Sequence, residues 1–337
     1  MSDPGIIAAE RGLKAVEKRI RAIYKKAEKE IRETVRAYNI RFMRKDAEMR
    51  QKLTEKLITE SEYRSWLSLS VFRGAQWDAK VNHCTEVMLD ANKMATKVIR
   101  GEQIGVFAEN MTFQAYSFEH GVGANLGFGI YDSNTVSNLL KKQPELLPRR
   151  VIDGVKDRAW NKNKIANEIT SAIIKGDGIQ GIAESLAKTL CRQNDDAMVR
   201  YARTAMTAAQ NSGRIEMMHE AEESGVKTKK KWIATLDSRT RDAHADLDGQ
   251  VKDVDEPFSV KFDEEQVEID YPGDPSCNEP GMVYNCRCTL GYVIEGYEGH
   301  GQRRAYNEWD DESGHHRQSV LIEDMTYREW EKWKKGE

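Results

Sequence analysis

The residues best suited to chemistry lie in the last third of the chain. The segment Asp237–Gln250, DSRTRDAHADLDGQ, places one histidine among several aspartates, and three of the five cysteines fall within twelve residues of one another. Imidazole and thiolate are the usual ligands of structural zinc, which four protein ligands hold in a tetrahedron. The sequence therefore predicts one structural zinc ion, and its expected ligands are His244, Cys277, Cys286 and Cys288.

Two structural alternatives to zinc stay open for the same residues. Cys286 and Cys288 are two positions apart, so they share a face on a strand, whereas zinc knuckles usually have the spacing C-x-x-C. The cysteines could instead be small buried residues beside a hydrogen-bonded histidine. Cys277 and Cys288 could also form a disulfide after release from the cell, although an odd number of cysteines argues against a disulfide scaffold.

A catalytic alternative rests on the aspartates around the histidine. Together these side chains could bind a divalent cation and activate a water molecule for phosphodiester cleavage. The residues concerned are His244, Asp237, Asp246 and Asp248. The cluster has no second histidine and no second zinc knuckle, and no recognisable motif places a catalytic base. We therefore expect a protein that is not an enzyme, with a metal-dependent nuclease as the alternative function.

The composition excludes several classes of protein. The 337 residues are 39% hydrophobic and 32% charged, with seven prolines and a net charge of −3. Such a chain is long enough for two or three packed units and favours long helices. No apolar run approaches the ~20 residues that span a bilayer, and the first residues do not resemble a signal peptide. We expect a protein made in a cytoplasm, whose attraction to nucleic acid would come from local patches.

The first long segment has the pattern of an amphipathic helix with a basic surface. Apolar residues recur every three or four positions from Leu13 to Tyr38, which is one helical face. Between Arg11 and Lys45, thirteen Lys or Arg residues and four Glu residues give a net charge of +9. Such a helix packs its apolar stripe on a neighbour, and its basic residues could also contact DNA phosphates or an acidic partner. The residues expected to make these contacts are Lys14, Lys18, Arg21, Lys25, Arg32 and Arg36.

Glycines, prolines and changes of pattern divide the chain into five expected regions. The predicted fold class is mainly α with a small α+β C-terminal unit: long N-terminal helices, a helical middle and a short-stranded unit that contains the Cys/His residues. The regions are 1–104, an N-terminal basic helical region; 105–148, a Gly/aromatic connecting region; 149–226, a helical middle domain; 227–294, the α+β unit; and 295–337, a C-terminal tail.

Several elements are expected inside these regions. Glycines mixed with aromatic residues predict loops or short strands over 105–129. Asn194 or Asp195 suits the first position of a helix, and the tail tryptophans Trp309, Trp330 and Trp333 suit either docking into a partner or a terminal helix. The expected helices are 46–59, 60–69, 78–99, 162–175, 179–190 and 195–223, and the expected strands are 231–236 and 289–294.

A family resemblance is carried by the C-terminal motifs. The segment WIATLDSRTRDAHADLDGQ, followed by PGDP and NCRCTL, closely resembles the signature of the Mu F-like phage head-morphogenesis family, the minor capsid proteins of many tailed phages. The upstream stretches WNKNKIANEITSAIIKGDGIQGIAESLAKTL and YARTAMTAAQNSGRIEMMHEA are similar too, so the resemblance covers about residues 157–294. Members often carry cysteines where this chain has Arg241 and His244, which leaves Cys277 as the substitute ligand.

The resemblance implies a minor component of the virion, located in the head interior near the portal vertex and active in head assembly and in DNA packaging or ejection. The implied partners are the phage portal protein and phage DNA, bound without sequence specificity. The major capsid or scaffold protein and further copies of the chain are additional candidate partners, and no membrane is expected. The resemblance supplies no catalytic residues.

Overall fold

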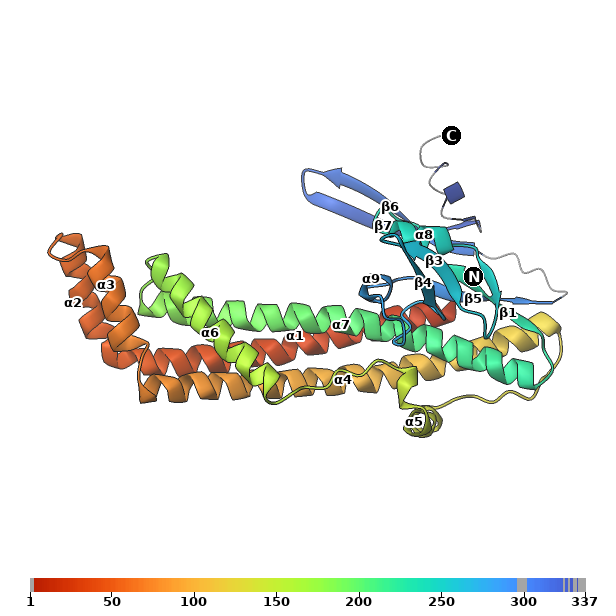
Figure 1. Cartoon of the computed structure of the whole chain (residues 1–337), viewed down its shortest axis with the longest axis horizontal. Helices are drawn as coiled ribbons and strands as arrows, with labels where there is room; N and C mark the ends of the chain where they lie inside the picture. Colours follow the sequence, from red (N-terminus) through yellow and green to blue (C-terminus); the bar gives the residue numbers. More distant parts are fainter. Residues whose placement is uncertain (1–2, 296–301, 324, 327, 330–331, 333–337) are drawn as a thin grey trace. The chain divides into compact units, whose positions relative to one another are not determined.

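Three long helices dominate the fold. They are α1 (Pro4–Asn39), α4 (Ala75–Val122) and α7 (Ile179–Glu223), visible as the long ribbons of Figure 1. This computed structural model describes residues 3–295, 302–323, 325–326, 328–329 and 332. The chain forms two compact units: unit 1 contains residues 1–16, 99–149 and 200–337, and unit 2 contains residues 17–98 and 150–199. The predicted fold class, mainly α with a small C-terminal unit of strands, is confirmed.

Unit 2 is helical throughout its core. To its parts of α1, α4 and α7 it adds α2 (Met43–Thr54), α3 (Glu60–Trp66) and α6 (Lys156–Ile174). The buried stripe of α1 runs from Ile20 through Ile31 to Val35, as the apolar pattern predicts. No helix in the described residues is both long enough and apolar enough to cross a membrane.

A chain of buried polar side chains aligns the helices of unit 2. The Tyr24 hydroxyl of α1 donates to Asn92 Oδ1 of α4, and Asn92 Nδ2 donates to Asn194 Oδ1 of α7 at 3.2 Å. Asn194 Nδ2 then lies 3.4 Å from Asn161 Oδ1 of α6. A buried network of this kind is stable only when every member finds its partner, so it favours one axial alignment of the four helices over alternatives with similar apolar packing.

The prediction of loops or strands from residue 105 onward is wrong as far as residue 122. Helix α4 continues to Val122, and Gly101 and Gly105 lie within it with open space beside their Cα atoms. A glycine inside a helix costs only about 1 kcal/mol, whereas burying one large apolar side chain contributes roughly 1.5–3 kcal/mol. The buried residues that outweigh the glycines are Val106, Phe107, Met111, Ala115 and Phe118.

The prediction of two helices between residues 179 and 223 is also wrong, because α7 is continuous. Asn194, expected to cap the second helix, lies inside α7 and is buried. Its side chain donates to the Leu190 carbonyl at 2.9 Å in addition to its place in the polar network. The polar residue that resembles a cap in the sequence is therefore a buried contact residue.

Substitution of Gly213 by alanine is expected to lower the free energy of unfolding by about 1–3 kcal/mol. A Cβ atom at Gly213 of α7 would lie 2.5 Å from the Phe107 backbone oxygen of α4, so the two helices of unit 1 would have to move apart. Gly105→Ala is the matched control, and its open surroundings should allow a gain of about 0.5–1 kcal/mol. Urea denaturation measures both, and equal effects of the two variants would contradict the close helix contact.

The strands of unit 1 form a small sheet and two hairpins. In the sheet, β1 (Thr228–Ile233) lies between β2 (Val251–Asp253) and β5 (Thr289–Ile294), and all pairs are antiparallel. Strand β5 has the predicted bounds, and β1 begins three residues before the predicted 231. The two hairpins are β3–β4 (Phe258–Phe262 and Glu265–Ile269) and β6–β7 (Gln302–Asp311 and Gly314–Glu323). The shorter α-helices described in this unit are α5 (Ser133–Lys142), α8 (Asp242–Leu247) and α9 (Pro280–Val283).

Part of the predicted tail is therefore strand. Residues 302–323 form the hairpin β6–β7, in which Trp309 is 45% exposed and its ring stacks on His316. Trp330 and Trp333, which were expected to dock or to form a terminal helix, lie outside the described residues.

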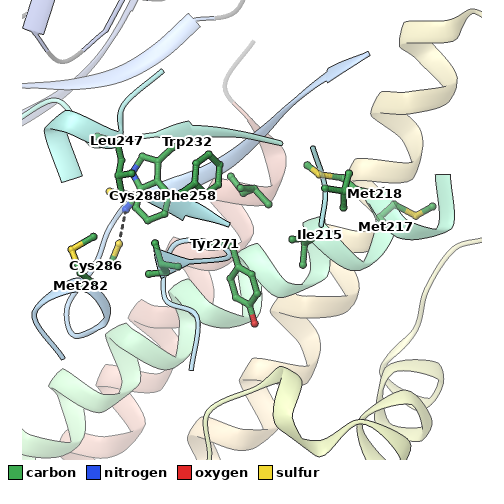
Figure 2. Close-up of a cluster of buried hydrophobic side chains, with 14 of the residues drawn as sticks. Ile215, Met217, Met218, Trp232, Leu247, Phe258, Tyr271, Met282, Cys286 and Cys288 are labelled. Carbon is green, nitrogen blue, oxygen red and sulfur yellow. Dashed lines mark hydrogen bonds between the residues drawn. The ribbon is translucent and has the colours of Figure 1, made fainter. Parts of the chain in front are cut away.

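One apolar core joins the strands of unit 1 to its helices. Trp232 of β1 packs edge-on against Phe258 of β3, with ring centroids 5.3 Å apart. The same cluster includes Met217 and Met218 of α7 and Phe118 of α4. Figure 2 shows Trp232 and Phe258 beside Cys288 at one end of this cluster and the two methionines of α7 at the other. The Cys/His residues are therefore set into a large core.

Candidate metal centre and arginine-lined cavity

The structure brings three of the four predicted zinc ligands together. His244 lies on α8, and Cys286 and Cys288 lie in the segment that leads into β5. His244 Nδ1 is 3.3 Å from Cys288 Sγ and 3.6 Å from Cys286 Sγ. All three side chains are buried, and their ligand atoms lie within 4.8 Å of one another.

These separations fit a tetrahedral zinc ion. A zinc–sulfur distance of ~2.3 Å and a zinc–nitrogen distance of ~2.1 Å place two ligand atoms of a tetrahedron roughly 3.6 Å apart. The two nitrogen–sulfur distances agree with that value, and Nδ1 is the histidine atom that contacts both sulfurs. His244 Nε2 is buried without a hydrogen-bond partner, so the ring is not a fully satisfied core histidine. The donor set fits zinc with three protein ligands.

Helix α7 positions the cysteines through a row of polar side chains. Thr207 Oγ1 donates to the Cys286 carbonyl at 2.7 Å, and Asn211 Nδ2 donates to the Cys288 carbonyl at 3.2 Å. Asn211 Oδ1 also accepts from the Leu290 backbone N–H at 2.8 Å. These side chains share one face of α7, because they lie four positions apart, and they hold the backbone on both sides of the two thiols.

The two thiols have opposite pKa shifts. Burial raises the pKa of Cys286, but hydrogen bonds from the Cys288 side chain and backbone and the charges of Arg241 and Arg287 outweigh burial, so that its pKa is lowered overall. Burial raises the pKa of Cys288 well above its ordinary value, and a thiolate at Cys286 raises it further. Without a cation the pair therefore favours one thiolate, and a bound dication would favour two.

Cys277 does not join this group in the described part of the chain. Its thiol is half-buried and lies 4.0 Å from the Glu279 carbonyl, after a turn in which Asp274 accepts from the backbone and side chain of Ser276. All five cysteines are free thiols, so the alternative of a Cys277–Cys288 disulfide is not present.

The aspartates of the nuclease alternative make other contacts. Asp237 is buried, and its two carboxylate oxygens accept hydrogen bonds from the Arg287 guanidinium group. Asp248 accepts from the Ala234 backbone N–H at 2.7 Å, and Asp246 pairs with Arg328 at 2.6 Å. Across the residues that the structure describes, none of the three joins His244 in a ligand group.

The predicted basic residues of α1 are mostly exposed. Lys14, Lys18, Arg21, Lys25 and Arg36 are exposed and Arg32 is half-buried. Arg32 pairs with Glu28, and Arg36 pairs with Glu184 of α7 in unit 2. Positions 14, 18, 21 and 25 are separated by three or four residues and so share one face of α1.

A cavity of about 610 Å³ in unit 1 borders the three candidate ligands. Threonines and Gln210 contribute to its wall, and Glu10 is the carboxylate residue among the lining side chains. Five arginines also line it: Arg200, Arg203, Arg239, Arg241 and Arg287. Sequence reasoning missed this cavity, because the arginines come from α7, the loop after β1 and the segment before β5. The only signals were two arginines three positions apart in RYARTAM and two more in SRTR.

Lys230→Met is expected to raise the free energy of unfolding by about 1–3 kcal/mol at pH 7. The Lys230 side chain of β1 is fully buried, and its Nζ has no hydrogen-bond partner. Burial lowers the pKa of Lys230 below its ordinary value of 10.5, although Asp270 acts in the opposite direction. The unfolded chain thus binds more protons between the two pKa values, and stability rises with pH in that window.

Urea denaturation of both proteins at pH 7 and pH 10 tests this prediction. The advantage of Lys230→Met should shrink at pH 10, because the buried lysine loses its proton more readily than the lysine of the unfolded chain and then no longer places a charge in the core. Lys229→Met is the control, since that exposed lysine pairs with Asp253 and solvent screens the pair, so that its removal should change the stability little at either pH. A pH-independent difference between Lys230→Met and the unchanged chain would refute the titration argument.

Comparison with known proteins connects these features to a family. The family described as phage Mu protein F like protein matches residues 163–291, which include the three candidate ligands. The minor head protein GP7 of Bacillus phage SPP1 is 32% identical over 238 residues, 68% of this chain and 70% of that protein. No solved structure matches the chain.

Two further relatives match shorter segments. The NAD(+)–arginine ADP-ribosyltransferase EFV of Enterococcus faecalis is 30% identical over 141 residues, which are 40% of this chain and only 27% of that protein. The uncharacterized protein YqbB of Bacillus subtilis is 30% identical over 164 residues, 45% of this chain and 51% of that protein. The SPP1 protein is matched over most of both chains. On that match and the family segment, the chain belongs to the Mu F-like phage head-morphogenesis family.

Proposed function

We propose that the protein is a phage minor head protein that acts in head assembly at the portal vertex and in DNA packaging or ejection. The observation that carries this proposal is the similarity to the minor head protein of SPP1 over 70% of that protein's length. The partners proposed are the portal protein and phage DNA, with the major capsid or scaffold protein and further copies of the chain as additional candidates. The protein is made in the host cytoplasm and ends in the head interior near the portal.

The proposed contact with DNA uses the basic face of α1. Lys14, Lys18, Arg21 and Lys25 are exposed on that face, and their charges are not needed for the buried stripe of the helix. Arg32 and Arg36 pair with glutamates, so they contribute less net charge to a phosphate. Binding of this kind is not sequence-specific, and its affinity falls steeply as salt rises because bound counterions are released from DNA.

The proposed role of the metal centre is structural. His244, Cys286 and Cys288 would hold one zinc ion with three protein ligands, one fewer than a closed structural site has, and bound zinc would supply a crosslink between α8 and the segment that leads into β5. The aspartates of the nuclease alternative contact arginines or backbone N–H groups and not His244. These contacts do not support a catalytic cation site among them. We therefore propose that the protein is not an enzyme.

Two experiments test the proposed function. The purified chain should be retained by immobilised portal protein of the same phage and should be present in purified procapsids, and absence from both contradicts the proposal. For DNA, a Lys14→Ala/Lys18→Ala/Lys25→Ala variant should flatten the slope of log affinity against log salt by roughly 0.9 per lost contact. The control is Lys52→Ala/Lys97→Ala/Lys188→Ala, three exposed lysines elsewhere, which should leave the slope unchanged.

A further inference from the structure

The wall of the arginine-lined cavity contains more arginines than carboxylates. Five arginines border it together with one carboxylate residue, Glu10. Asp237, which pairs with Arg287 and lies 3.9 Å from Arg239, is fully buried and does not line the cavity. Like charges held around one space repel one another, and this repulsion is relieved when an anion enters.

Two of the arginines are fixed in place by other parts of unit 1. Arg241 Nη2 donates to the Tyr284 carbonyl at 2.7 Å, and Arg287 Nη2 donates to Asp237 Oδ1 at 2.7 Å. Arg200 and Arg203 project from one face of α7, since they are three positions apart. Guanidinium groups that are positioned before binding lose less entropy when a ligand arrives, so the cavity is preorganised for an anion.

Size and donor type indicate which anion. A cavity of about 610 Å³ exceeds the needs of one small ion and lies in the range of sites for nucleotide-sized ligands, roughly 300–1,000 Å³. Planar guanidinium groups match the oxygens of phosphate in two-pronged contacts, which single point charges cannot reproduce. Arginines that approach from three segments suit a ligand with more than one phosphate, or one phosphate and its neighbouring sugar.

We propose that this cavity is a binding site for phosphate esters, and that its principal ligand is the phosphodiester backbone of DNA. This proposal adds a second site to the DNA-binding part of the proposed function. It rests on the proposed function only in naming DNA as the source of the phosphate. It assigns a second DNA contact to unit 1, made by arginines of the cavity and not by the α1 lysines. A free nucleotide offers the same chemistry, and the experiment below distinguishes the two sources.

The test measures binding of a labelled duplex oligonucleotide, of ATP and of a polyglutamate peptide to the full zinc-loaded chain. The variant is Arg200→Glu/Arg239→Glu, two exposed arginines of the cavity, and its matched control is Lys188→Glu/Arg192→Glu, two exposed residues of α7 outside the cavity. The cavity variant should weaken phosphate-ester binding by at least about tenfold, the loss expected for one strong charged hydrogen bond. The control should stay within about twofold of the unchanged chain.

The outcomes separate this inference from the proposed function. Weakened binding of DNA and ATP, with unchanged zinc content and thermal unfolding, supports a phosphate-ester site, and weakened ATP binding with intact DNA binding supports the site but assigns it to free nucleotides. Equal losses in the cavity variant and the control overturn it, as does peptide binding as tight as that of DNA. If the cavity variant changes neither DNA nor ATP affinity while the α1 lysines change DNA affinity, the cavity proposal fails and the proposed function stands. If portal binding fails while the cavity variant loses DNA, only the assembly role fails.

Discussion

The Cys286→Ser variant is expected to purify without zinc and to unfold at a lower urea concentration than the unchanged chain. Cys286 Sγ is one of three buried ligand atoms grouped around His244 Nδ1, and serine would offer a poor ligand at the same place. When free zinc exceeds the dissociation constant a thousandfold, metal that binds only the folded state stabilises it by about 4 kcal/mol. Metal analysis by mass spectrometry and urea denaturation with and without a chelator measure the two effects.

Cys277→Ser is the matched control for that variant. Cys277 lies in the same twelve-residue stretch but outside the group of ligand atoms, so the control should retain one equivalent of zinc and nearly the stability of the unchanged chain. Less than about 0.1 equivalent in the unchanged chain would reject the site. Loss of zinc from Cys277→Ser would instead show that the loop rearranges to provide a fourth ligand, as the sequence alone predicts.

Arg214→Leu is expected to lower the free energy of unfolding by about 3–5 kcal/mol. The Arg214 side chain of α7 is only 3% exposed and donates to both carboxylate oxygens of Asp3, at 2.7 and 2.8 Å. It also donates to Asn110 Oδ1 of α4 and to the Leu290 carbonyl of β5. Leucine fills most of the space but removes this donor from the buried Asn110 Oδ1 and the Leu290 carbonyl, and each such loss costs about 1–3 kcal/mol.

Arg11→Leu separates the effect of burial from the effect of losing an ion pair. Arg11 pairs with Glu109 at 2.6 Å, but both side chains are at least half exposed. Solvent screens such a pair, and its removal should change the free energy of unfolding by at most about 1 kcal/mol. Urea denaturation of both variants provides the comparison, and a loss below about 1 kcal/mol in Arg214→Leu would refute the role assigned to this residue.

Residue type and local spacing predicted part of the site. Cys286 and Cys288 share a short segment before a strand whose bounds the apolar pattern predicted, and His244 was the one histidine in the nearby polar cluster. Cys277 was included because it is close in sequence. Closeness in sequence says little about a ligand once a turn intervenes, and the Asp274 turn lies just before this cysteine.

Contacts between distant segments could not be predicted from one sequence. Phe107 is buried, and Phe118 is buried in one cluster with α7 and the strands. This packing keeps α4 helical through glycines that locally favour a loop. In the sequence Asn194 resembles a helix cap, and only the structure shows that it is buried against Asn161. The arginines of the cavity belong to three separated segments, so their spacing in the sequence does not indicate that they line one cavity.

The three contacts of Arg214 limit which truncated forms of the chain can fold. Its partners Asp3 and Asn110 lie outside residues 163–291, the stretch shared across the family, and residues 163–199 of that stretch belong to unit 2. An excised fragment of those boundaries would expose a buried cation and part of an apolar core to water, which favours aggregation. The stretch shared by the family is therefore smaller than the part of the chain that should fold by itself. A soluble truncation would have to retain the N-terminal segment that contains Asp3 and the part of α4 that contains Asn110.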